Sequence, residues 1–384
     1  MTLIDRRDFL RGAAGAVFGG ALFPRVFTYD LSALTHAGTF DMIVLGDSIM
    51  WGQGLKDEQK FSYRVEQWVR DQLPGVHVRR HVLAHSGARI KADAAEDAKP
   101  PKHGEVPWRY PSITAQLERA KTIVDPASVS LILLDGGIND FGSKVIVNPD
   151  PTVDADWVRR VTREKTVDRM KGLLPKVADA FPNAKVVLTN YFLIVSRKSE
   201  LVILWELLRA WELIEPPKTE WVRDKMAAHA LAFHEESTAG FREAVREVTQ
   251  KLLATNNTKT TLPRRNVAMN VERLALPPSR VALADVGFGP EHAYGAPQTR
   301  LFYVNEPDPA ASVRKPMCVA QLPDGSPEFA NCLIAASGHP NVAGARAYAD
   351  AIIGVAQRWL PEWQATYGVT PARTTVRRPA IGRP

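Results

Sequence analysis

The feature that most constrains the fold of this chain is a set of five short apolar runs, rich in Val, Ile and Leu, without strict polar alternation. Such runs are typical of strands buried on both faces, as in a parallel sheet. They predict strands at residues 40–45, 76–83, 129–134, 185–188 and 280–285. Helical patterns lie between or after them, at residues 62–72, 113–122, 158–181, 220–254 and 343–360. Strands that alternate with helices predict right-handed crossovers and a doubly wound α/β sandwich.

The chain of 384 residues is long enough to bury a substantial core, and its patterns predict one main domain at residues 38–368. We expect a helical insertion in this domain at about residues 195–275. The last residues, 369–384, are rich in Pro and Arg and are predicted to be disordered.

The formal net charge of +7 is concentrated at the two ends of the chain. The first 28 residues contribute +2 and the last 16 contribute +4, which leaves about +1 for the residues between them. These intervening residues show no basic stripe and no nucleic-acid-binding motif. We therefore expect no nucleic-acid partner.

The N-terminus resembles a twin-arginine export signal. Residues 5–11 read Asp-Arg-Arg-Asp-Phe-Leu-Arg and precede a Gly- and Ala-rich apolar stretch at residues 12–23. This stretch is shorter than the roughly 20 residues that span a bilayer, so we expect no stable membrane span. The pattern predicts a signal segment and linker at residues 1–37 and export to the periplasm or the exterior. The alternative is an amphipathic N-terminal helix with a chance pair of arginines.

The chain has two cysteines, Cys318 and Cys332, which could form a disulfide in an oxidising compartment or remain two buried thiols. No grouping of His, Cys, Asp and Glu has the spacing of a metal site. We expect neither a metal nor another cofactor.

A serine follows the first predicted strand, in the sequence Gly-Asp-Ser at residues 46–48. In open α/β folds, ligands bind at the carboxyl ends of the parallel strands. The helix expected after Ser48 would place its N-terminus, which favours negative charge, beside this hydroxyl. Ser48 is therefore a candidate nucleophile, although Gly-Asp-Ser alone is a weak signal.

Three further groups are expected at the same edge of the sheet. Gly87 follows the second strand, and its missing Cβ would let its N–H approach a substrate closely. Asn139 follows the third strand, and His339 precedes the last helix. Acyl transfer needs a nucleophile, a base and N–H donors for an oxyanion, and these residues could supply all three.

In their order along the chain, these segments resemble the four signature blocks of the GDSL/SGNH hydrolases. The blocks are Gly-Asp-Ser at 46–48, Gly87, Gly-Ile-Asn-Asp at 137–140 and His-Pro-Asn at 339–341. The resemblance covers residues 41 to about 355, which is most of the chain. It implies a flavodoxin-like three-layer α/β/α sandwich with a parallel sheet of about five strands.

The same resemblance implies roles for individual residues. Ser48 would be the nucleophile and His339 the base. The backbone N–H groups of Ser48 and Gly87 and the side chain of Asn139 would form the oxyanion hole. Members of this family include esterases, lipases, polysaccharide deacetylases and some acyltransferases.

One position departs from the family pattern. The family usually has an aspartate three residues before the histidine, where it orients the imidazole, but this chain has Ala336 there. A backbone carbonyl near Ala336 could orient His339, a carboxylate from elsewhere could replace the aspartate, or the protein could be a weak or inactive member.

Other segments leave alternatives open. The apolar stretch at 201–211 could be a lid or an acyl-binding wall, or a helix packed into the core. The long loop at 91–112 is expected to shape the substrate pocket, unless it is a surface excursion. Trp51 could stack on sugar rings or pack in a turn. His85 could line the pocket or make a structural hydrogen bond. Asp47 is expected to accept N–H groups in its own turn.

The sequence thus predicts an exported serine hydrolase that cleaves short-chain or acetyl esters through an acyl-enzyme on Ser48. Its partner would be a small-molecule or glycan ester. Acyl transfer to a glycan hydroxyl would use the same residues. A third hypothesis, which Ala336 favours, is a catalytically weak protein that binds carbohydrate or lipid.

Overall fold

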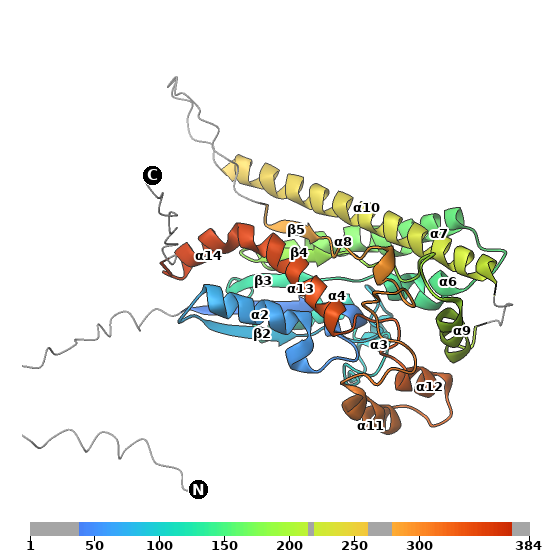
Figure 1. Ribbon diagram of the computed structural model, residues 1–384. Helices are drawn as coiled ribbons and strands as arrows, with labels where there is room; N and C mark the ends of the chain where they lie inside the picture. The colour runs from blue at the N-terminus through green and yellow to red at the C-terminus, as the bar shows by residue number, and fades with distance from the viewer. Residues whose placement is uncertain (1–37, 214–218, 260–278, 371–384) are drawn as a thin grey trace, which may run out of the picture. The chain divides into compact units, whose positions relative to one another are not determined.

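The computed structural model describes residues 38–213, 219–259 and 279–370. The predicted signal segment lies outside the described residues, as does all of the predicted tail beyond residue 370. The described residues form an α/β structure around one parallel sheet (Figure 1).

The sheet has five strands, and every neighbouring pair of strands in it is parallel. In spatial order the strands are β2 (His77–Val82), β1 (Thr39–Leu45), β3 (Val129–Leu134), β4 (Lys185–Thr189) and β5 (Val281–Ala284). Each strand begins and ends within one residue of its prediction. The order is that of flavodoxin-like doubly wound folds, so the predicted fold class is confirmed.

The burial of the strands explains why their sequences are apolar runs. β3 lies in the middle of the sheet, and all six of its residues are buried. β2 lies at an edge, where His77 and Arg79 are exposed. A strand covered on both faces has no side that faces water, so its residues do not alternate between apolar and polar.

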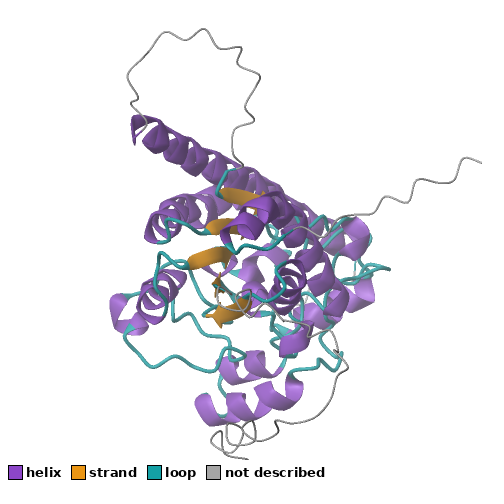
Figure 2. Cartoon of the chain, turned by 90° about the vertical axis from the view of Figure 1, so that its left-hand side faces the viewer, coloured by secondary structure: helices purple, strands orange, loops and turns teal. Residues whose placement is uncertain are grey.

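Helices cover both faces of the sheet (Figures 1 and 2). On one face, α2 (Phe61–Gln72) and α13 (Val342–Ala356) pack against each other and against the strands. On the other, α4 (Ile113–Ile123) contacts α8 (Asp168–Ala180), and the long α10 (Glu220–Lys259) packs against α8 and β5. The result is the predicted three-layer α/β/α sandwich.

The face of α2 that contacts the core shows how the sequence produces this packing. Phe61, Val65 and Val69 are spaced four residues apart and are all buried, because that spacing keeps them on one side of a helix. The ring of Phe61 stacks on Tyr348 of α13, with ring centroids 5.1 Å apart. This contact joins the two helices of the layer.

The helix predicted at residues 158–181 is interrupted. α7 (Ala155–Thr162) is followed by a π-helical turn, η3 (Arg163–Val167), before α8 begins. The hydroxyl of Thr166 in this turn donates to the backbone carbonyl of Gly137 at 3.0 Å. The extra residue that a π turn contains leaves no clear mark in the sequence, because both flanking segments have helical patterns.

Most of the remaining helices lie in loops at the carboxyl ends of the strands. They are α1 (Ser48–Trp51), η2 (Asp57–Gln59), α3 (Ala94–Asp97), α5 (Ile138–Phe141), α6 (Ser143–Val147), α9 (Leu201–Ala210), η4 (Pro290–His292), α11 (Ala311–Gln321), α12 (Pro327–Leu333), η5 (Gln357–Trp359) and α14 (Leu360–Thr366). The predicted insertion contains α9 and α10 in its described part, and its status as an insertion stays a prediction. No helix within the described ranges is long and apolar enough to cross a bilayer.

A disulfide joins α11 to α12. The Cα atoms of Cys318 and Cys332 are 5.9 Å apart, within the range that a disulfide requires. The two sulfurs lie in a small hydrophobic cluster of their own, together with Val106 and Leu322. Of the two alternatives left open by the sequence, the structure has the disulfide.

Candidate active site

The loops after the strands bring the predicted site residues to one edge of the sheet. Ser48 is the first residue of α1, which follows β1 after a tight turn. Asp47 caps this helix, because its Oδ1 accepts the backbone N–H of Ile49 at 2.9 Å. A side chain at Gly46 would collide with Asp135 Oδ1, so this turn needs glycine. Asp47 thus has the structural role that its position predicted.

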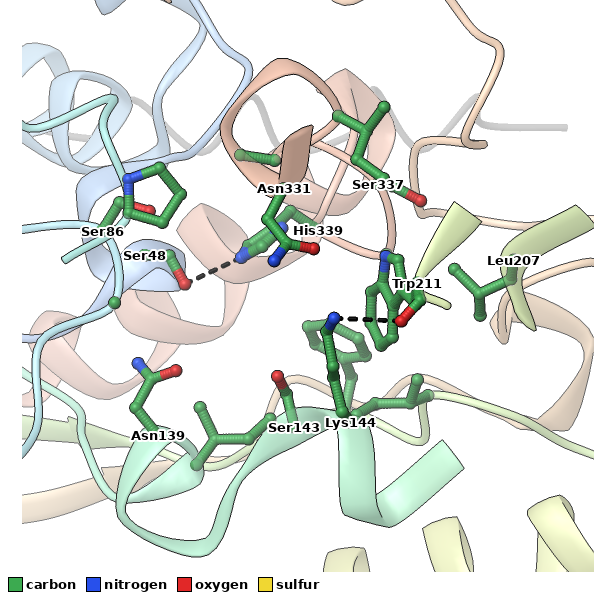
Figure 3. A pocket seen from close by; sticks show the side chains of 18 residues that line it. Ser48, Ser86, Asn139, Ser143, Lys144, Leu207, Trp211, Asn331, Ser337 and His339 are labelled. Carbon is green, nitrogen blue, oxygen red and sulfur yellow. Dashed lines mark hydrogen bonds between the residues drawn. The ribbon is translucent and has the colours of Figure 1, made fainter. Parts of the chain in front are cut away.

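Ser48 and His339 are in direct contact, although 291 positions separate them in the sequence. The Oγ of Ser48 lies 2.7 Å from Nε2 of His339 (Figure 3). The loop that carries His339 is held by backbone bonds, including one from the N–H of Phe302 to the His339 carbonyl at 2.9 Å. Asn341 then caps α13 by accepting the N–H groups of Ala343 and Gly344.

The other ring nitrogen of His339 has no hydrogen-bond partner in the part of the chain that the structure describes. Nδ1 is buried, and no carboxylate among the described residues lies within 4.0 Å of the ring. The backbone at Ser337, Ala336 and Ala335 surrounds this side of the imidazole and favours its protonated form, but no carbonyl has hydrogen-bonding geometry. The position of the missing aspartate is therefore not filled by another described acid.

Burial makes His339 a weakly basic, neutral imidazole. Desolvation lowers its pKa to about 4, the adjacent backbone opposes this shift, and the nearby Arg314 guanidinium adds to it. At neutral pH the ring is therefore uncharged, and its Nδ1–H tautomer can accept the proton of the Ser48 hydroxyl at Nε2. This is the protonation state that a general base requires.

Gly87 and Asn139 lie at the same pocket as Ser48. Gly87 has φ +81, and a Cβ there would lie 2.6 Å from the backbone nitrogen of Trp108, so only glycine fits. The side-chain amide of Asn139 donates to the Ala88 carbonyl at 3.0 Å, which fixes the orientation of its Nδ2. Within the described residues, the backbone N–H groups of Ser48 and Gly87 donate to no protein acceptor.

Tyr191, which follows β4, connects two of these loops and was not predicted from the sequence. Its hydroxyl donates to Asp47 Oδ2 at 2.7 Å and accepts the N–H of Ile138 at 3.1 Å. One fully buried phenol thus joins the loop of Ser48 to the loop of Asn139. The apolar run around Tyr191 gave no signal of this role, because its partners follow other strands.

Two buried carboxyl groups lie beneath the nucleophile. Burial raises the pKa of Asp47 to about 6, although the N–H of Ile49 and the hydroxyl of Tyr191 lower it. Burial and the adjacent charge of Asp47 raise the pKa of Asp135 well above its usual value. The N–H of Asp47 donates to Asp135 Oδ1 at 2.9 Å.

A cavity of about 170 Å³ opens beside Ser48 and His339 (Figure 3). Much of its lining is apolar, and that part comprises Pro107, Ile138, Phe192, Ile194, Leu207, Trp211, Ile334 and Ala335. Leu207 and Trp211 belong to the stretch for which the sequence left open a lid, an acyl-binding wall or a core helix. α9 packs into the core through Leu204 and Leu208 and forms part of the pocket wall through Leu207.

Trp51 and His85, which the sequence left open as pocket residues, do not line this cavity. Trp51 packs in its turn, with its indole N–H donated to Glu105 at 2.9 Å and the Lys60 ammonium 3.6 Å from the ring centroid. His85 is held by the backbone carbonyls of Ser86 and Lys102. The long loop at 91–112 does reach the pocket, through Pro107.

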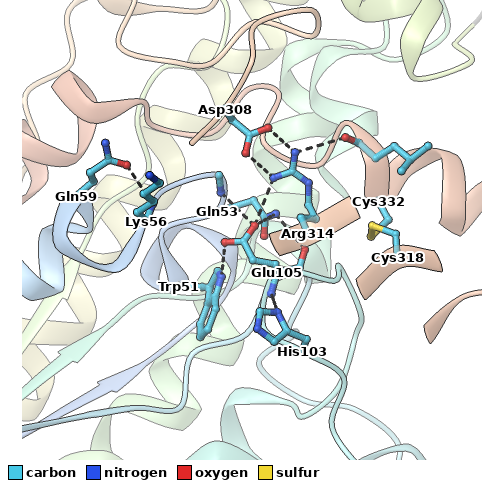
Figure 4. Close-up of polar contacts among 12 residues, drawn as sticks. Trp51, Gln53, Lys56, Gln59, His103, Glu105, Asp308, Arg314, Cys318 and Cys332 are labelled. Carbon is cyan, nitrogen blue, oxygen red and sulfur yellow. Dashed lines mark hydrogen bonds and ion pairs between the residues drawn. A yellow bond between two sulfur atoms is a disulfide. The ribbon is translucent and has the colours of Figure 1, made fainter. Parts of the chain in front are cut away.

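A buried ionic cluster stands between this loop, α11 and α12 (Figure 4). Arg314 is almost fully buried, pairs with Asp308, and lies 3.4 Å from Glu105 and from the Leu333 carbonyl. Gln53, just after α1, donates to Glu105 Oε2 at 2.9 Å. The cluster thus connects the elements that surround His339 to the loop of Ser48, and no sequence pattern indicated it.

Within the described ranges, no group of three or more His, Cys, Asp or Glu is arranged to hold a metal ion. The groups at this site that could take part in acyl transfer are Ser48, His339 and the N–H donors around them. These groups can polarise and attack a carbonyl carbon.

No family model matches the chain, and no curated protein matches it in sequence. Its structural neighbours are lipases and carbohydrate esterases. An extracellular lipase from Streptomyces rimosus has 14% identity and a TM-score of 0.46, with 82% of this chain and 99% of that chain covered. A carbohydrate esterase family 2 enzyme from Myceliophthora fergusii has 14% identity and a TM-score of 0.35, covering 90% and 70%. A GDSL-like lipase from Parabacteroides merdae has 11% identity and a TM-score of 0.34, covering 84% and 96%.

Proposed function

We propose that this protein is a serine hydrolase that cleaves carboxylic esters through an acyl-enzyme on Ser48. The observation that carries the proposal is the 2.7 Å contact between Ser48 Oγ and a neutral His339 Nε2 at the mouth of a mainly apolar cavity. A serine hydroxyl is a weak nucleophile by itself and is activated by a base in this position.

The proposed reaction has two halves. Ser48 Oγ bonds to the ester carbonyl carbon as its proton passes to His339 Nε2, and the negative charge develops on the carbonyl oxygen. His339 then donates that proton to the leaving alcohol as the C–O bond breaks, which leaves Ser48 acylated. In the second half, His339 deprotonates water, water attacks the acyl carbon, and Ser48 regains its proton.

We propose three donors for the oxyanion. The N–H groups of Ser48 and Gly87 have no protein acceptor among the described residues, and the Asn139 amide lines the same cavity. Donors that are fixed before the reaction stabilise the developing charge without further reorganisation, and each typically contributes about 10²–10³ to the rate.

We propose that Ser48 and His339 act as a dyad. His339 Nδ1 has no carboxylate partner, so the backbone at 335–337 and the close packing of its loop must hold the ring. The imidazolium formed during the reaction would be less stabilised than in a triad with an acid. The dyad is therefore expected to be slower than such a triad.

The cavity limits the size of the proposed acyl group. A volume of about 170 Å³ is close to that of an engineered apolar cavity of ~150 Å³ that binds benzene. An acyl group of a few carbons would fill this space, which supports short-chain esters as substrates.

We also propose that the protein is exported. The disulfide supports an oxidising compartment, and the paired arginines at residues 6–7 support a twin-arginine signal. A fusion of residues 1–37 to a reporter that needs this route would test the signal, with Arg6→Lys and Arg7→Lys as the matched variant. Export that is unchanged in the variant would contradict the proposal.

The first experiment is hydrolysis of p-nitrophenyl acetate and p-nitrophenyl hexanoate by the wild type and by Ser48→Ala. We expect turnover by the wild type and background rates in the variant. Labelling by a fluorophosphonate reports whether Ser48 is activated even if both esters are poor substrates. A wild-type protein that neither turns over an ester nor reacts with the label would contradict the proposed function.

A further inference from the structure

Among the described residues that line the cavity beside Ser48, Lys144 is the only one with a charged side chain at neutral pH, and none has a carboxylate. His339 does not add to this charge, because burial lowers its pKa to about 4. The described lining therefore carries a positive charge that no acid in the cavity neutralises.

Lys144 is placed so that its ammonium faces the substrate space. It belongs to α6, and its Nζ donates to the Trp211 carbonyl at 3.0 Å. Figure 3 shows Nζ extending into the pocket on the side opposite Ser48 and His339. An ammonium has three N–H donors, and the Trp211 carbonyl takes one of them.

Some lysines with restricted exposure have acidic partners, whereas Lys102, like Lys144, donates to a backbone carbonyl and has no described carboxylate within 4.0 Å. Lys171 pairs with Glu243 and Glu247, and Lys185 pairs with Glu362. No described carboxylate lies within 4.0 Å of Lys144. A half-buried cation without an acid is costly to desolvate, and a bound anion would offset that cost.

Two polar side chains lie around the same space as Lys144. Ser143, also on α6, and Asn331, on α12, both line the cavity, and neither side chain has a hydrogen-bond partner among the described residues. In Figure 3 their polar ends and the Lys144 ammonium surround the space between His339 and Trp211. A hydroxyl, an amide and an ammonium together offer several donors to an anionic group.

We infer that the cavity binds esters that carry an anionic group, a carboxylate or a phosphate, close to the scissile carbonyl, and that Lys144 selects them. The inference rests on the proposed function of Ser48 and His339 and names the substrate class of that site. The apolar wall formed by Leu207 and Trp211 would cover the carbon chain between the reacting carbonyl and the anion. A charge-assisted hydrogen bond at a partly desolvated site is stronger than one in open water.

Two matched pairs of substrates test this inference and locate the anion. For the acyl side, the mono-p-nitrophenyl ester of adipic acid is compared with p-nitrophenyl hexanoate. For the alcohol side, 4-(hexanoyloxy)benzoate is compared with its neutral methyl ester. Each pair is assayed with the wild type, with Lys144→Met, and with Lys121→Met as a control that removes a surface lysine paired with Glu118 on α4.

We expect the wild type to prefer the anionic member of at least one pair by about tenfold in kcat/KM, the size of one charge-assisted hydrogen bond. Lys144→Met should lose that preference, whereas Lys121→Met should keep it. The preference should also fall as salt is added. A purely structural role for Lys144 would lower both rates together, and an unchanged preference in Lys144→Met in both pairs would overturn the inference.

Binding separates this inference from the proposed function. Calorimetric titration of Ser48→Ala with the same intact esters measures selection without turnover. Tighter binding of the anionic ester that disappears in Ser48→Ala/Lys144→Met would support the anion site even if the wild type cleaves neither ester. Equal binding of anionic and neutral esters to Ser48→Ala would overturn it even if the wild type is an active esterase.

Discussion

The two halves of the candidate dyad are supported very differently. On the nucleophile side, Asp47, Tyr191 and Asp135 form a fully buried network that ties the loop of Ser48 to the neighbouring loops. On the histidine side, His339 Nδ1 has no partner, and the surrounding helices are held by a disulfide and by the Arg314 cluster. The nucleophile is thus positioned by hydrogen bonds and the base mainly by packing.

This difference shows which kind of change each side should tolerate. A buried hydrogen-bond network fails when one partner is removed, because the remaining groups are left unsatisfied. A side chain held by packing tolerates changes around it as long as its loop keeps its shape. The predictions below compare the two sides, from the largest expected effect to the smallest.

Replacement of the base should have the largest effect. His339→Gln removes the proton acceptor for Ser48 and should lower kcat by about 10⁴- to 10⁶-fold. The measurement is steady-state hydrolysis of p-nitrophenyl hexanoate, with circular dichroism to show that the variant is folded. A folded variant that keeps more than about a tenth of wild-type kcat would mean that His339 is not the base.

The hydrogen-bond network next to Ser48 can be disrupted by a substitution that leaves Ser48 and His339 unchanged. Tyr191→Phe keeps the ring but removes the hydroxyl that joins Asp47 to Ile138. We expect kcat to fall by roughly 10- to 100-fold with little change in KM, and stability to fall by about 1–3 kcal/mol, because two buried polar groups lose their partner. Urea unfolding and steady-state kinetics measure the two effects separately.

Tyr367→Phe is the matched control for this variant, since its hydroxyl bonds to Ser130 and the Thr39 carbonyl at the opposite end of β1. It should keep wild-type kcat. If both tyrosine variants lower kcat equally, Tyr191 acts only through general stability and not by positioning the two loops.

Removal of the disulfide should weaken the packing of α11 and α12 near the loop of His339. Cys318→Ser/Cys332→Ser opens a loop of 14 residues and should lower the free energy of unfolding by about 3 kcal/mol. Because α11 and α12 precede the loop of His339, we expect kcat to fall only a few-fold at a temperature where the variant is folded. A loss of activity as large as that of Tyr191→Phe would show that the two sides are equally sensitive.

The smallest expected effect is that of mild acid. His339 has its pKa lowered to about 4, and its neutral form is the active one, so activity is lost as pH falls through that value. About nine-tenths of kcat/KM should therefore remain at pH 5, where a histidine of ordinary pKa near 6.5 would leave only a few per cent. A pH–rate profile measures this.

The same pH–rate profile also shows whether protonation of Asp47 or of His339 limits activity in acid. Asp47 has a pKa raised to about 6 by burial, and it accepts hydrogen bonds as the carboxylate. An acid limb near pH 6 that moves in Tyr191→Phe would mean that protonation on the nucleophile side limits activity first. An acid limb near 4 that is unchanged in this variant would assign it to His339.

The sequence alone determined the sheet and the order of its functional loops. β1 and β3 are recognisable because strands buried on both faces must be apolar, which is a local property of the chain. Ser48, Gly87, Asn139 and His339 could be proposed because each follows a predicted strand or precedes a predicted helix. The π turn before α8 could not be predicted, because Thr166 donates to the carbonyl of Gly137, which lies in a separate loop.

Only the tertiary structure decided how these residues are supported. The partner of Asp47 is Tyr191, 144 positions away, and the cluster around Arg314 reaches Glu105 across 209 positions. Neither contact has a periodic pattern, because each depends on how separate loops pack at one edge of the sheet. The pairing of Cys318 with Cys332 also depends on loop packing, as does the lack of a described partner for His339 Nδ1. Burial shifts the pKa values of Asp47 and His339, and burial is a property of the packed chain.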